Sequence, residues 1–500
     1  MCGILCVFGT RKKLLQFGTL RHRGPDDTRV VHFGKCTMEF SRLAINSLSD
    51  DGMQPFVSES GALICNGEVY NHKELGTQSD QSDCACLLPL ITERGFANAV
   101  LALDGEYALC YTDGTKVFAA RDSYGVRPLF YTEFTDYDGQ QGIAFASEVK
   151  ALLQFESRVE IFPPGHWYSN GAFHKVQRDV TTESVKTSLD RAVLKRIENA
   201  DRPIGFLLSG GLDSSLVVAI ANKTLKKVRT FSIGVEGGDS PDLKAARVVS
   251  EHLGTEHTEV TFTVEQGISA LEDVIRSLES YDTTTVRASV PMWLLARHIS
   301  RHTDIKVLLS GEGSDELFGG YLYFHNAPSV DDLRDECSRR LRLIHQFDGL
   351  RADRWISAHG LELRVPFLDD TVVDSGMNID QSEKLSGPDR IEKKHLRDLY
   401  QGYLPDEILY RQKNGMSDAV GYSWVDHVKQ IAETLVTDEE FRGTKVTSGP
   451  VPQTKEEALY RRIFWKYFGH QDHLISEIWR PKWTDVMDPS ARQLGVFKQE

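Results

Sequence analysis

The stretch PIGFLLSGGLDSSLVVAIA (203–221) joins an apolar strand pattern, a glycine-rich turn and an apolar helix pattern in direct succession. Such a turn aims unpaired backbone N–H groups and the N-terminus of the helix at an anion. No lysine follows the glycines, so this is not the P-loop motif, and the glycine pattern of dinucleotide-binding folds is absent as well. The turn therefore predicts an anion-binding site of a different kind from these two motifs.

An acid inside this turn suggests that a metal cation takes part in the binding. Asp213 would repel a phosphate unless a cation lies between them, and Mg²⁺ prefers carboxylate and phosphate oxygens. A second stretch, IKVLLSGEGSDELFGGY (305–321), repeats the order of strand, Ser-Gly turn and acids, at Glu312, Asp315 and Glu316. Loops that end neighbouring strands of a parallel sheet meet at one edge, where such sheets bind ligands. We expect a magnesium-dependent nucleotide site there.

The sequence around these turns supports a parallel sheet. From residue 203 onward, strand and helix patterns alternate through VRTFSIGV (228–235), PDLKAARVVSEHLG (241–254) and HTEVTFT (257–263). Alternation at this spacing is typical of a parallel sheet covered by helices. A helix is predicted over 183–199, and the chain beyond about residue 270 has mostly helical patterns.

The first 170 residues have a different character, with short strand patterns separated by turns. Examples are ALICNGEVYN (62–71), RPLFYTEF (127–134) and GEYALCYTDGTKVFAARD (105–122), in which Asp113-Gly114 predicts a hairpin turn. We therefore expect two domains, with a boundary near 170–185.

Composition excludes several classes of protein. The 500 residues are 40% apolar and 26% charged, which rules out a disordered or fibrous chain. No run of about 18 uncharged apolar residues occurs, and the start MCGILCVFGT does not resemble a signal peptide. Eight scattered cysteines do not form a disulfide framework. A net charge of −14 argues against nonspecific nucleic-acid binding. We expect a reduced, cytoplasmic protein with no membrane or nucleic-acid partner.

The thiol next to the start of the chain is a candidate nucleophile. Cys2 follows Met1 and is small, so we expect Met1 to be removed. The α-amine of Cys2 would then titrate at about 7.7–8.0 and could serve as the general base for its own thiol. A lone Met-Cys start is more often a small buried hydrophobe, so the assignment depends on motifs further along the chain.

The first 131 residues carry such motifs and resemble the glutamine amidotransferase domain of the N-terminal-nucleophile class. The resemblance rests on RHRGPDD (21–27), SRLAI (41–45), NGEVYNH (66–72), QSD (81–83) and RDSYGVRPLFY (121–131). It implies an α+β, four-layer αββα sandwich with Cys2 as the nucleophile. It also implies that Arg42 clamps the glutamine α-carboxylate and that Glu68 and Asp83 hold the α-ammonium. The Asn66 side chain and the Gly67 backbone N–H would form the oxyanion hole.

The second part resembles the ATP pyrophosphatase domain of the glutamine-dependent asparagine synthetase family. The resemblance rests on the motifs SGGLDSS (209–215), SPDLKAA (240–246), YDTTTVRAS (281–289), SGEGSDELFGGY (310–321), ELRVPFLD (362–369), YRQKNGMSD (410–418) and DPSAR (488–492). The resemblance implies an α/β domain with added helices over 183–500, after a glutaminase domain over 2–175.

The same resemblance assigns roles in the second domain. ATP would contact Leu207, Ser209, Gly210, Gly211, Asp213, Ser214, Ser215, Ile233, Ser310 and Gly311. Asp213 and Asp315 would bind Mg²⁺. Glu312 would act beside the aspartate carboxylate, Lys413 would meet phosphate charge, and Arg364 would lie near aspartate.

The implied reaction is asparagine synthesis. Aspartate would attack the α-phosphorus of ATP to give β-aspartyl-AMP and pyrophosphate, and ammonia from glutamine would reach the acyl-adenylate through an interdomain tunnel. Hexosamine-6-phosphate synthases and phosphoribosyl amidotransferases share the first domain but lack SGGLDSS, whereas β-lactam-forming and peptide-cyclising relatives usually depart from the Cys2 constellation. A non-catalytic glutamine or nucleotide sensor is excluded only by turnover. A homodimer is a candidate assembly.

One segment departs from the family pattern. Only KELGTQSDQS (73–82) connects NGEVYNH to Asp83, where the family commonly has a longer insert, and Ala85 replaces its usual polar or acidic residue. A misplaced binding group costs rate, so we hypothesise weaker glutamine capture and some hydrolysis uncoupled from asparagine formation. The alternative is that neighbouring loops fill the gap.

The ratio of glutamate to asparagine released in one reaction distinguishes these alternatives. A loosened site predicts glutamate in excess and weak glutamine saturation. A one-to-one ratio with ordinary saturation would mean that the short connection changes nothing.

Overall fold

The computed structural model describes residues 1–9, 15–78, 81–136, 139–238, 240–387, 390–413, 415, 421, 423–446, 448–488 and 494. Packing divides the chain into two units. The first comprises Met1–Asp179 with the segments Glu198–Pro203 and Ile356–Glu362, and the second comprises Val180–Ile197, Ile204–Trp355 and Leu363–Glu500. Two short segments that are flanked in the chain by second-unit residues therefore pack with the first unit.

Two six-stranded sheets form the first unit. Sheet A has the order β10-β8-β9-β1-β3-β2 and sheet B the order β12-β11-β7-β6-β5-β4. The strands are β1 (Gly3–Phe8), β2 (Asp27–Phe33), β3 (Cys36–Arg42), β4 (Phe56–Ser58), β5 (Gly61–Val69), β6 (Gly105–Thr112), β7 (Val117–Arg121), β8 (Phe130–Thr135), β9 (Gln141–Ala146), β10 (Glu160–Ile161), β11 (His166–Ser169) and β12 (Ala172–Lys175). β6 and β7 form the hairpin expected at Asp113-Gly114.

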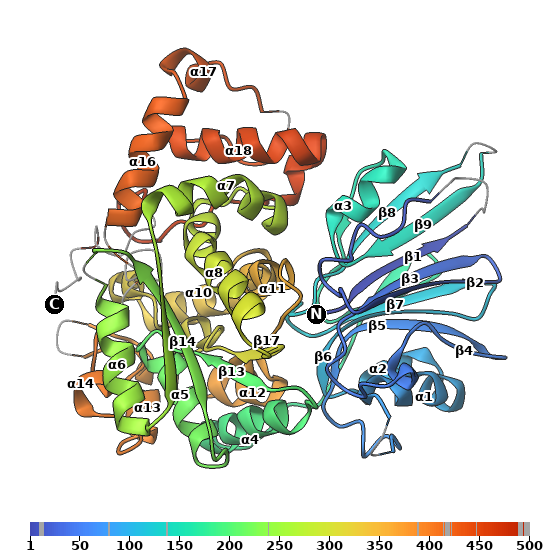
Figure 1. Ribbon diagram of the computed structural model, residues 1–500, viewed down its shortest axis with the longest axis horizontal. Coiled ribbons are helices and arrows are strands. Elements are labelled where there is room, and N and C mark those ends of the chain that lie inside the picture. The colour runs from blue at the N-terminus through green and yellow to red at the C-terminus, as the bar shows by residue number, and fades with distance from the viewer. Residues whose placement is uncertain are drawn as a thin grey trace. The chain divides into compact units, whose positions relative to one another are not determined.

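The two faces of sheet B enter different cores. Along β5, Ala62 and Ile64 pack against Ile4 and Cys6 of β1, whereas Leu63 and Cys65 pack against helices α1 (Leu87–Arg94) and α2 (Phe96–Leu101). This follows from the two-residue period of a strand. The short helix α3 (Val149–Leu152) packs on β8 and β9 of sheet A (Figure 1). The expected αββα sandwich is confirmed, with a thin outer layer over sheet A.

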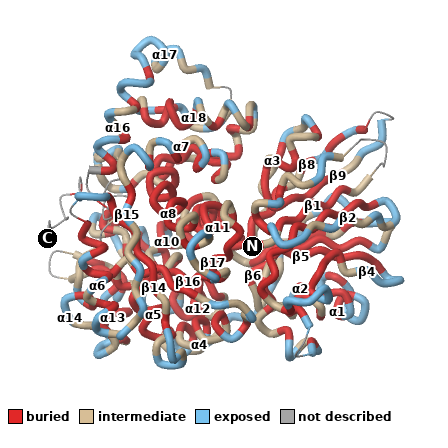
Figure 2. The backbone as a smooth tube through the Cα atoms, in the orientation of Figure 1, coloured by how far each residue is buried: buried red, intermediate tan, exposed pale blue. Residues whose placement is uncertain are grey.

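Burial follows the same plan. The central strands β1, β3, β5 and β6 are buried along most of their length, whereas the edge strand β2 is largely exposed (Figure 2). The part of the chain that the structure describes contains no helix long and apolar enough to cross a membrane.

A five-stranded sheet of order β15-β14-β13-β16-β17 organises the second unit. Its strands are β13 (Ile204–Leu207), β14 (Arg229–Val235), β15 (Glu256–Phe262), β16 (Val307–Leu309) and β17 (Glu362–Arg364). β13 pairs in parallel with β14 and β16, and β14 with β15, so the expected parallel sheet is confirmed.

Helices pack around this sheet and form the rest of the unit. α5 packs on β13, and α6 and α8 pack on β14 and β15 (Figure 1). The helices are α4 (Val185–Glu198), α5 (Leu212–Asn222), α6 (Pro241–Leu253), α7 (Val264–Leu278), α8 (Thr283–His302), α9 (Ser314–Phe318), α10 (Val330–Leu343), α11 (Asp348–Ser357), α12 (Asp370–Met377), α13 (Lys394–Leu399), α14 (Asp406–Leu409), α16 (Ser423–Leu435), α17 (Asp438–Arg442) and α18 (Lys455–Phe468).

The turn after β13 can pack closely on α6 only because it contains glycine. Gly210 has a φ of +72°, and a Cβ at this position would lie 2.4 Å from the backbone nitrogen of Ala246 in α6. The turn thus combines a left-handed backbone with a helix contact that has no room for a methyl group.

Gly210→Ala is therefore expected to destabilise the second unit by about 2–4 kcal/mol, the sum of left-handed strain and overpacking. Gly254→Ala is the matched control, because Gly254 ends α6 at a φ of +67° and a Cβ there would have no heavy atom within 4 Å. It should lose about 1 kcal/mol. Urea unfolding compares them, and equal losses would show that the close approach to α6 is unimportant.

Candidate functional site

Strand pairing brings Cys2 beside the end of β3. Cys2 directly precedes β1, and Gly3 pairs with Ser41, so Cys2 lies next to Arg42 and Leu43. The backbone N–H of Leu43 donates to the Cys2 Sγ at 3.4 Å. The Arg42 guanidinium donates to the carbonyls of Ser49, at 2.8 Å, and Ser47. Arg42 is therefore near the thiol, and its terminal nitrogens fix the loop that follows it.

Asn66 presents a buried donor to this region. The strand period places it on the same face of β5 as Ile64, and Cys2 packs against the core on that face. Asn66 is 1% exposed, and among the described residues its Nδ2 has no hydrogen-bond partner. An unpaired buried amide is costly, and an oxyanion hole needs such a donor. At Gly67, a Cβ would lie 2.2 Å from the carbonyl oxygen of Glu106, so only glycine fits this strand position.

The two expected ammonium-binding acids are both buried. Glu68 Oε2 accepts N–H bonds from Asn46, at 2.6 Å, and from Asn199, at 2.8 Å. Asp83 is 3% exposed, and its Oδ2 accepts the backbone N–H of Val69 at 2.7 Å. This bond ties Asp83 to the strand that carries Asn66 and Glu68.

The short connection before Asp83 is relevant here, although Ser79 and Asp80 lie outside the described residues. The hydroxyl of Ser82 donates to Asp83 Oδ1 at 3.3 Å, in addition to the bond from Val69. These contacts favour the alternative in which neighbouring groups hold the acid. The effect on coupling stays a prediction.

The Cys2 thiol is protonated in this environment. Burial raises the pKa of Cys2 to about 11, and the negative charges of Glu362 and Glu68 act in the same direction. Burial also lowers the pKa of the Met1 α-amine to about 6, and this amine donates to the Leu361 carbonyl at 3.0 Å. The free amine of Cys2 exists only after removal of Met1, which stays a prediction.

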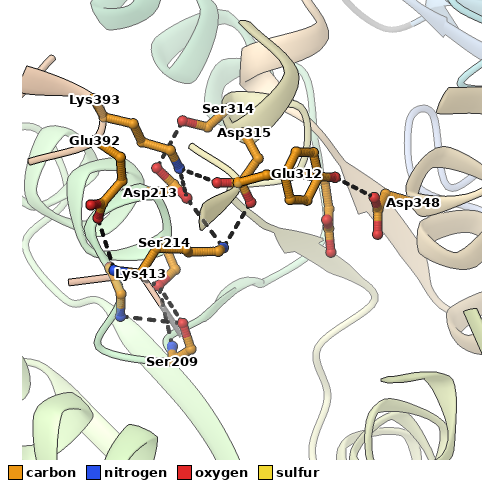
Figure 3. Close-up of polar contacts among 12 residues, drawn as sticks. Ser209, Asp213, Ser214, Glu312, Ser314, Asp315, Asp348, Glu392, Lys393 and Lys413 are labelled. Carbon is orange, nitrogen blue, oxygen red and sulfur yellow. Dashed lines mark hydrogen bonds and ion pairs between the residues drawn. The ribbon is translucent and has the colours of Figure 1, made fainter. Parts of the chain in front are cut away.

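In the second unit, the turns that follow β13 and β16 bring two carboxylates close together, where both form ion pairs with lysines (Figure 3). The Lys393 Nζ lies 2.6 Å from Asp213 Oδ2 and 2.6 Å from Asp315 Oδ1. The Lys413 Nζ lies 2.7 Å from Asp315 Oδ2. Burial favours the neutral acid, but Lys393 and Lys413 hold the pKa of Asp315 well below its usual value. The cluster therefore carries charge of both signs at the edge of the sheet.

Asp213 and Asp315 fit the expected magnesium site. They converge on one cationic group, Lys393, and Asp213 Oδ1 also accepts the Ser314 hydroxyl at 2.7 Å. The described residues contain no cluster of three or more histidine, cysteine or acidic side chains that could hold a metal by themselves. One or two carboxylates supplemented by substrate phosphates are the usual arrangement for Mg²⁺.

A cavity adjoins this cluster and has both apolar and polar walls. Leu207, Ile233, Met292 and Leu295 contribute apolar surface. The polar part includes Ser209, Gly211, Asp213, Ser214, Ser310, Gly311, Glu312, Asp315, Lys393, Arg411 and Lys413. The Ser209 backbone N–H and the Gly211 carbonyl both bond the Ser214 hydroxyl, which fixes the turn. We name this space the nucleotide cavity.

A second cavity shares Glu312, Asp315 and Lys413 with the first and is lined by charged groups. Arg351 lies 3.0 Å from Glu312 and also pairs with Asp348. The Tyr321 hydroxyl donates to Glu316 at 2.6 Å and lies 2.8 Å from Asp348. An arginine and several acids around one space suit a small ligand with charges of both signs. We name it the zwitterion cavity.

Glu312 lines both cavities and has an altered acidity. Burial raises its pKa from 4.5 to about 7, with Arg351 opposing and Asp348 adding to the increase. Burial also raises the pKa of Glu316 to about 8, again assisted by Asp348. Carboxyl groups with raised pKa values in a cavity are typical of functional sites.

The structure thus brings together most of the residues that the sequence singled out, with some additions. Ser215 is fully buried in α5, and Gly210 and Arg364 line neither cavity; the Arg364 guanidinium donates to the Arg196 carbonyl at 2.6 Å. Sequence reasoning missed Lys393 and Arg351, because neither follows a glycine turn or a strand pattern. Parts of YRQKNGMSD and DPSAR lie outside the described residues.

Comparisons with known proteins match both halves of the chain. The Asparagine synthase family model matches residues 184–335 and 327–487, and the Glutamine amidotransferase domain model matches residues 1–169. A probable glutamine-hydrolysing asparagine synthetase of Acanthamoeba polyphaga mimivirus is 40% identical over 558 aligned positions, which cover 99% of this chain and 100% of that protein. A Dictyostelium discoideum protein of the same name is 40% identical, covering 99% of each chain. Glutamine-hydrolysing asparagine synthetase 3 of Arabidopsis thaliana is 40% identical, covering 99% of this chain and 95% of its own.

The raised pKa of Glu312 gives a stability prediction with a definite sign. Its folded pKa of about 7 exceeds the ordinary 4.5, so the folded state binds this proton more tightly than the unfolded state, and stability falls as pH rises from about 4.5 to 7. Glu312→Gln removes this titration. It should be more stable than the parent at pH 8 by up to about 3 kcal/mol, with the difference disappearing near pH 4.5.

Urea unfolding at several pH values measures this difference. Glu59→Gln, at an exposed position, is the control and should show none. A Glu312→Gln variant that is no more stable than the parent at pH 8 would contradict the raised pKa.

Proposed function

Because this chain belongs to the family of glutamine-hydrolysing asparagine synthetases, we propose that it is an enzyme that makes asparagine from aspartate, ATP and glutamine, releasing AMP, pyrophosphate and glutamate. The observation that carries the proposal is the convergence of Asp213 and Asp315 on Lys393 in the nucleotide cavity, with Asp315 also lining the zwitterion cavity. ATP would occupy the first cavity and aspartate the second.

The proposed first reaction joins the two ligands. The β-carboxylate of aspartate attacks the α-phosphorus of ATP, and pyrophosphate leaves, which gives β-aspartyl-AMP. Lys413 and Lys393 offset the charge of the departing group, so that catalysis rests on positioning and electrostatics. Asp213 and Asp315 would hold Mg²⁺, which when bound neutralises phosphate charge. Arg351 suits the α-carboxylate of aspartate, and Glu316 and Asp348 suit its α-ammonium.

The proposed second reaction supplies nitrogen in the first unit. The Cys2 thiol attacks the side-chain amide carbon of glutamine while the freed α-amine of Cys2 takes up the thiol proton, and the tetrahedral oxyanion accepts hydrogen bonds from the Asn66 amide and the Gly67 N–H. The same proton passes to the amide nitrogen, the carbon–nitrogen bond breaks, and ammonia departs. Water then hydrolyses the remaining thioester to glutamate and free Cys2. Ammonia then displaces AMP from β-aspartyl-AMP and forms asparagine. All eight cysteines are free thiols, which suits a reducing compartment such as the cytoplasm.

Cys2→Ala should abolish asparagine synthesis from glutamine and leave synthesis from ammonia within about twofold of the parent, because the thiol and the nucleotide cavity lie in different units. Product analysis with each nitrogen source measures this. Loss of the ammonia-driven reaction in a folded variant would contradict the two-site scheme. Mass spectrometry of the active enzyme checks the start of the chain, and retained Met1 would exclude the free-amine base.

ATP should be cleaved between its α and β phosphates, since the turn at 209–215 carries Asp213 instead of the P-loop lysine. Phosphorus NMR should detect AMP and pyrophosphate, and ADP with orthophosphate would contradict the mechanism. Asp213→Asn should lower magnesium-dependent turnover by at least about 100-fold, because it removes a charge that the metal needs. Asp242→Asn, which alters an acid that lines the same cavity but pairs with Arg411 at 3.2 Å, should lose much less.

A further inference from the structure

The segment Glu198–Pro203 packs with the first unit although it leads directly into β13 and the turn at 209–215. Its residues bond the loop after Arg42. Asp201 Oδ2 accepts the backbone N–H of Ser47 at 2.8 Å, and the Arg202 side chain donates to the Ala44 carbonyl at 3.0 Å. These contacts hold the segment beside the residues expected to bind glutamine.

Asn199 makes a different kind of contact from this segment. Its Nδ2 donates at 2.8 Å to Glu68 Oε2, the oxygen that also accepts the Asn46 side chain at 2.6 Å. Asn199 and Glu68 are 8% and 4% exposed. Asn199 also lies close enough to His72 to influence the pKa of its ring, which the charge of Asp83 influences as well. Asn199 therefore bonds one expected glutamine-binding acid and lies beside a neighbour of the other.

Other buried or half-buried asparagines show what a purely structural role looks like. The Nδ2 of Asn222 donates to the Leu253 carbonyl, and the Nδ2 of Asn71 donates to the Ala102 carbonyl, so both bind backbone. Asn199 and Asn46 instead bind one titratable oxygen. A neutral amide fixes a carboxylate without cancelling its charge, whereas a lysine or arginine would neutralise it. A carboxylate held this way keeps its charge for a substrate ammonium group.

We infer that Asn199 is a positioning residue of the glutamine site, which fixes the Glu68 carboxylate for the substrate α-ammonium from the segment that continues into β13. Asn46 supports the same oxygen from the loop after Arg42. The inference rests on the proposed function, because it takes Glu68 as an ammonium-binding group. It adds two amide side chains to that site that no sequence motif marks.

The test separates glutamine capture from chemistry. Asn199→Ala should raise the KM for glutamine about five- to fiftyfold, since a hydrogen bond to a charged group is lost, with kcat for glutamine hydrolysis changed less than about threefold. Asn222→Ala is the matched control and should keep the parental KM. Ammonia-driven synthesis reports that the second unit of each variant is folded, and a retained kcat for glutamine hydrolysis reports the same for the first unit.

A double-mutant cycle shows whether Asn199 acts through Glu68. In a Glu68→Ala background, Asn199→Ala should raise KM by less than about twofold further, because no carboxylate remains to be positioned. If Asn199→Ala fails to fold, Asn46→Ala tests the same oxygen from the other loop, with the same expected rise and the same loss of effect without Glu68.

The outcomes distinguish the inference from the function on which it rests. A parent chain that hydrolyses glutamine, paired with an Asn199→Ala variant of parental KM, would overturn the inference alone. An increase in KM that persists undiminished without Glu68 would also overturn it, since the effect would then be structural. A parent chain that releases no glutamate from glutamine would overturn both.

Discussion

The second unit depends on a balance of charge at the edge of its parallel sheet. Two loops place Asp213 and Asp315 together in a half-buried position, where two carboxylates without cations would repel each other and any phosphate. Lys393 and Lys413 relieve this repulsion. The same cations can meet the charge of a triphosphate, so the interaction that stabilises the loops also prepares the cavity for its ligand.

In the first unit, neutral N–H groups donate to the buried carboxylates of Glu68 and Asp83. Glu68 accepts two side-chain amides, and Asp83 accepts a backbone N–H. These donors fix the carboxylates and leave their charges available, which suits recognition of an ammonium group. The Asn66 amide is a buried donor without a partner among the described residues, which suits an oxyanion. The second unit therefore presents cations toward the expected phosphates, and the first unit presents carboxylates toward the expected ammonium group.

Two short segments of the chain pack with the first unit but continue directly into strands of the second. Glu198–Pro203 and Ile356–Glu362 lie beyond residue 179 and are flanked in the chain by second-unit residues, but they pack with the first unit, and each leads into a strand of the parallel sheet. Residues in the first segment contact the loop after Arg42 and the Glu68 carboxylate. A substitution in these segments could therefore alter glutamine use without touching any recognised motif.

Local sequence patterns were enough to predict the short strands of the first unit, the hairpin at Asp113-Gly114, the parallel sheet, and the turns that carry Asp213 and Asp315, whereas the four-layer sandwich was predicted from the resemblance to the amidotransferase family. Each of these depends on neighbours in the chain: a two-residue period, glycine at a left-handed position, or a strand followed at once by a helix. The folded chain was needed to show that Lys393 lies between the two aspartates, that Arg351 pairs with Glu312, and that Asn199 reaches Glu68. These contacts join residues far apart in the chain, and a lone lysine, arginine or asparagine has no local pattern to mark it. Long-range packing alone sets their partners.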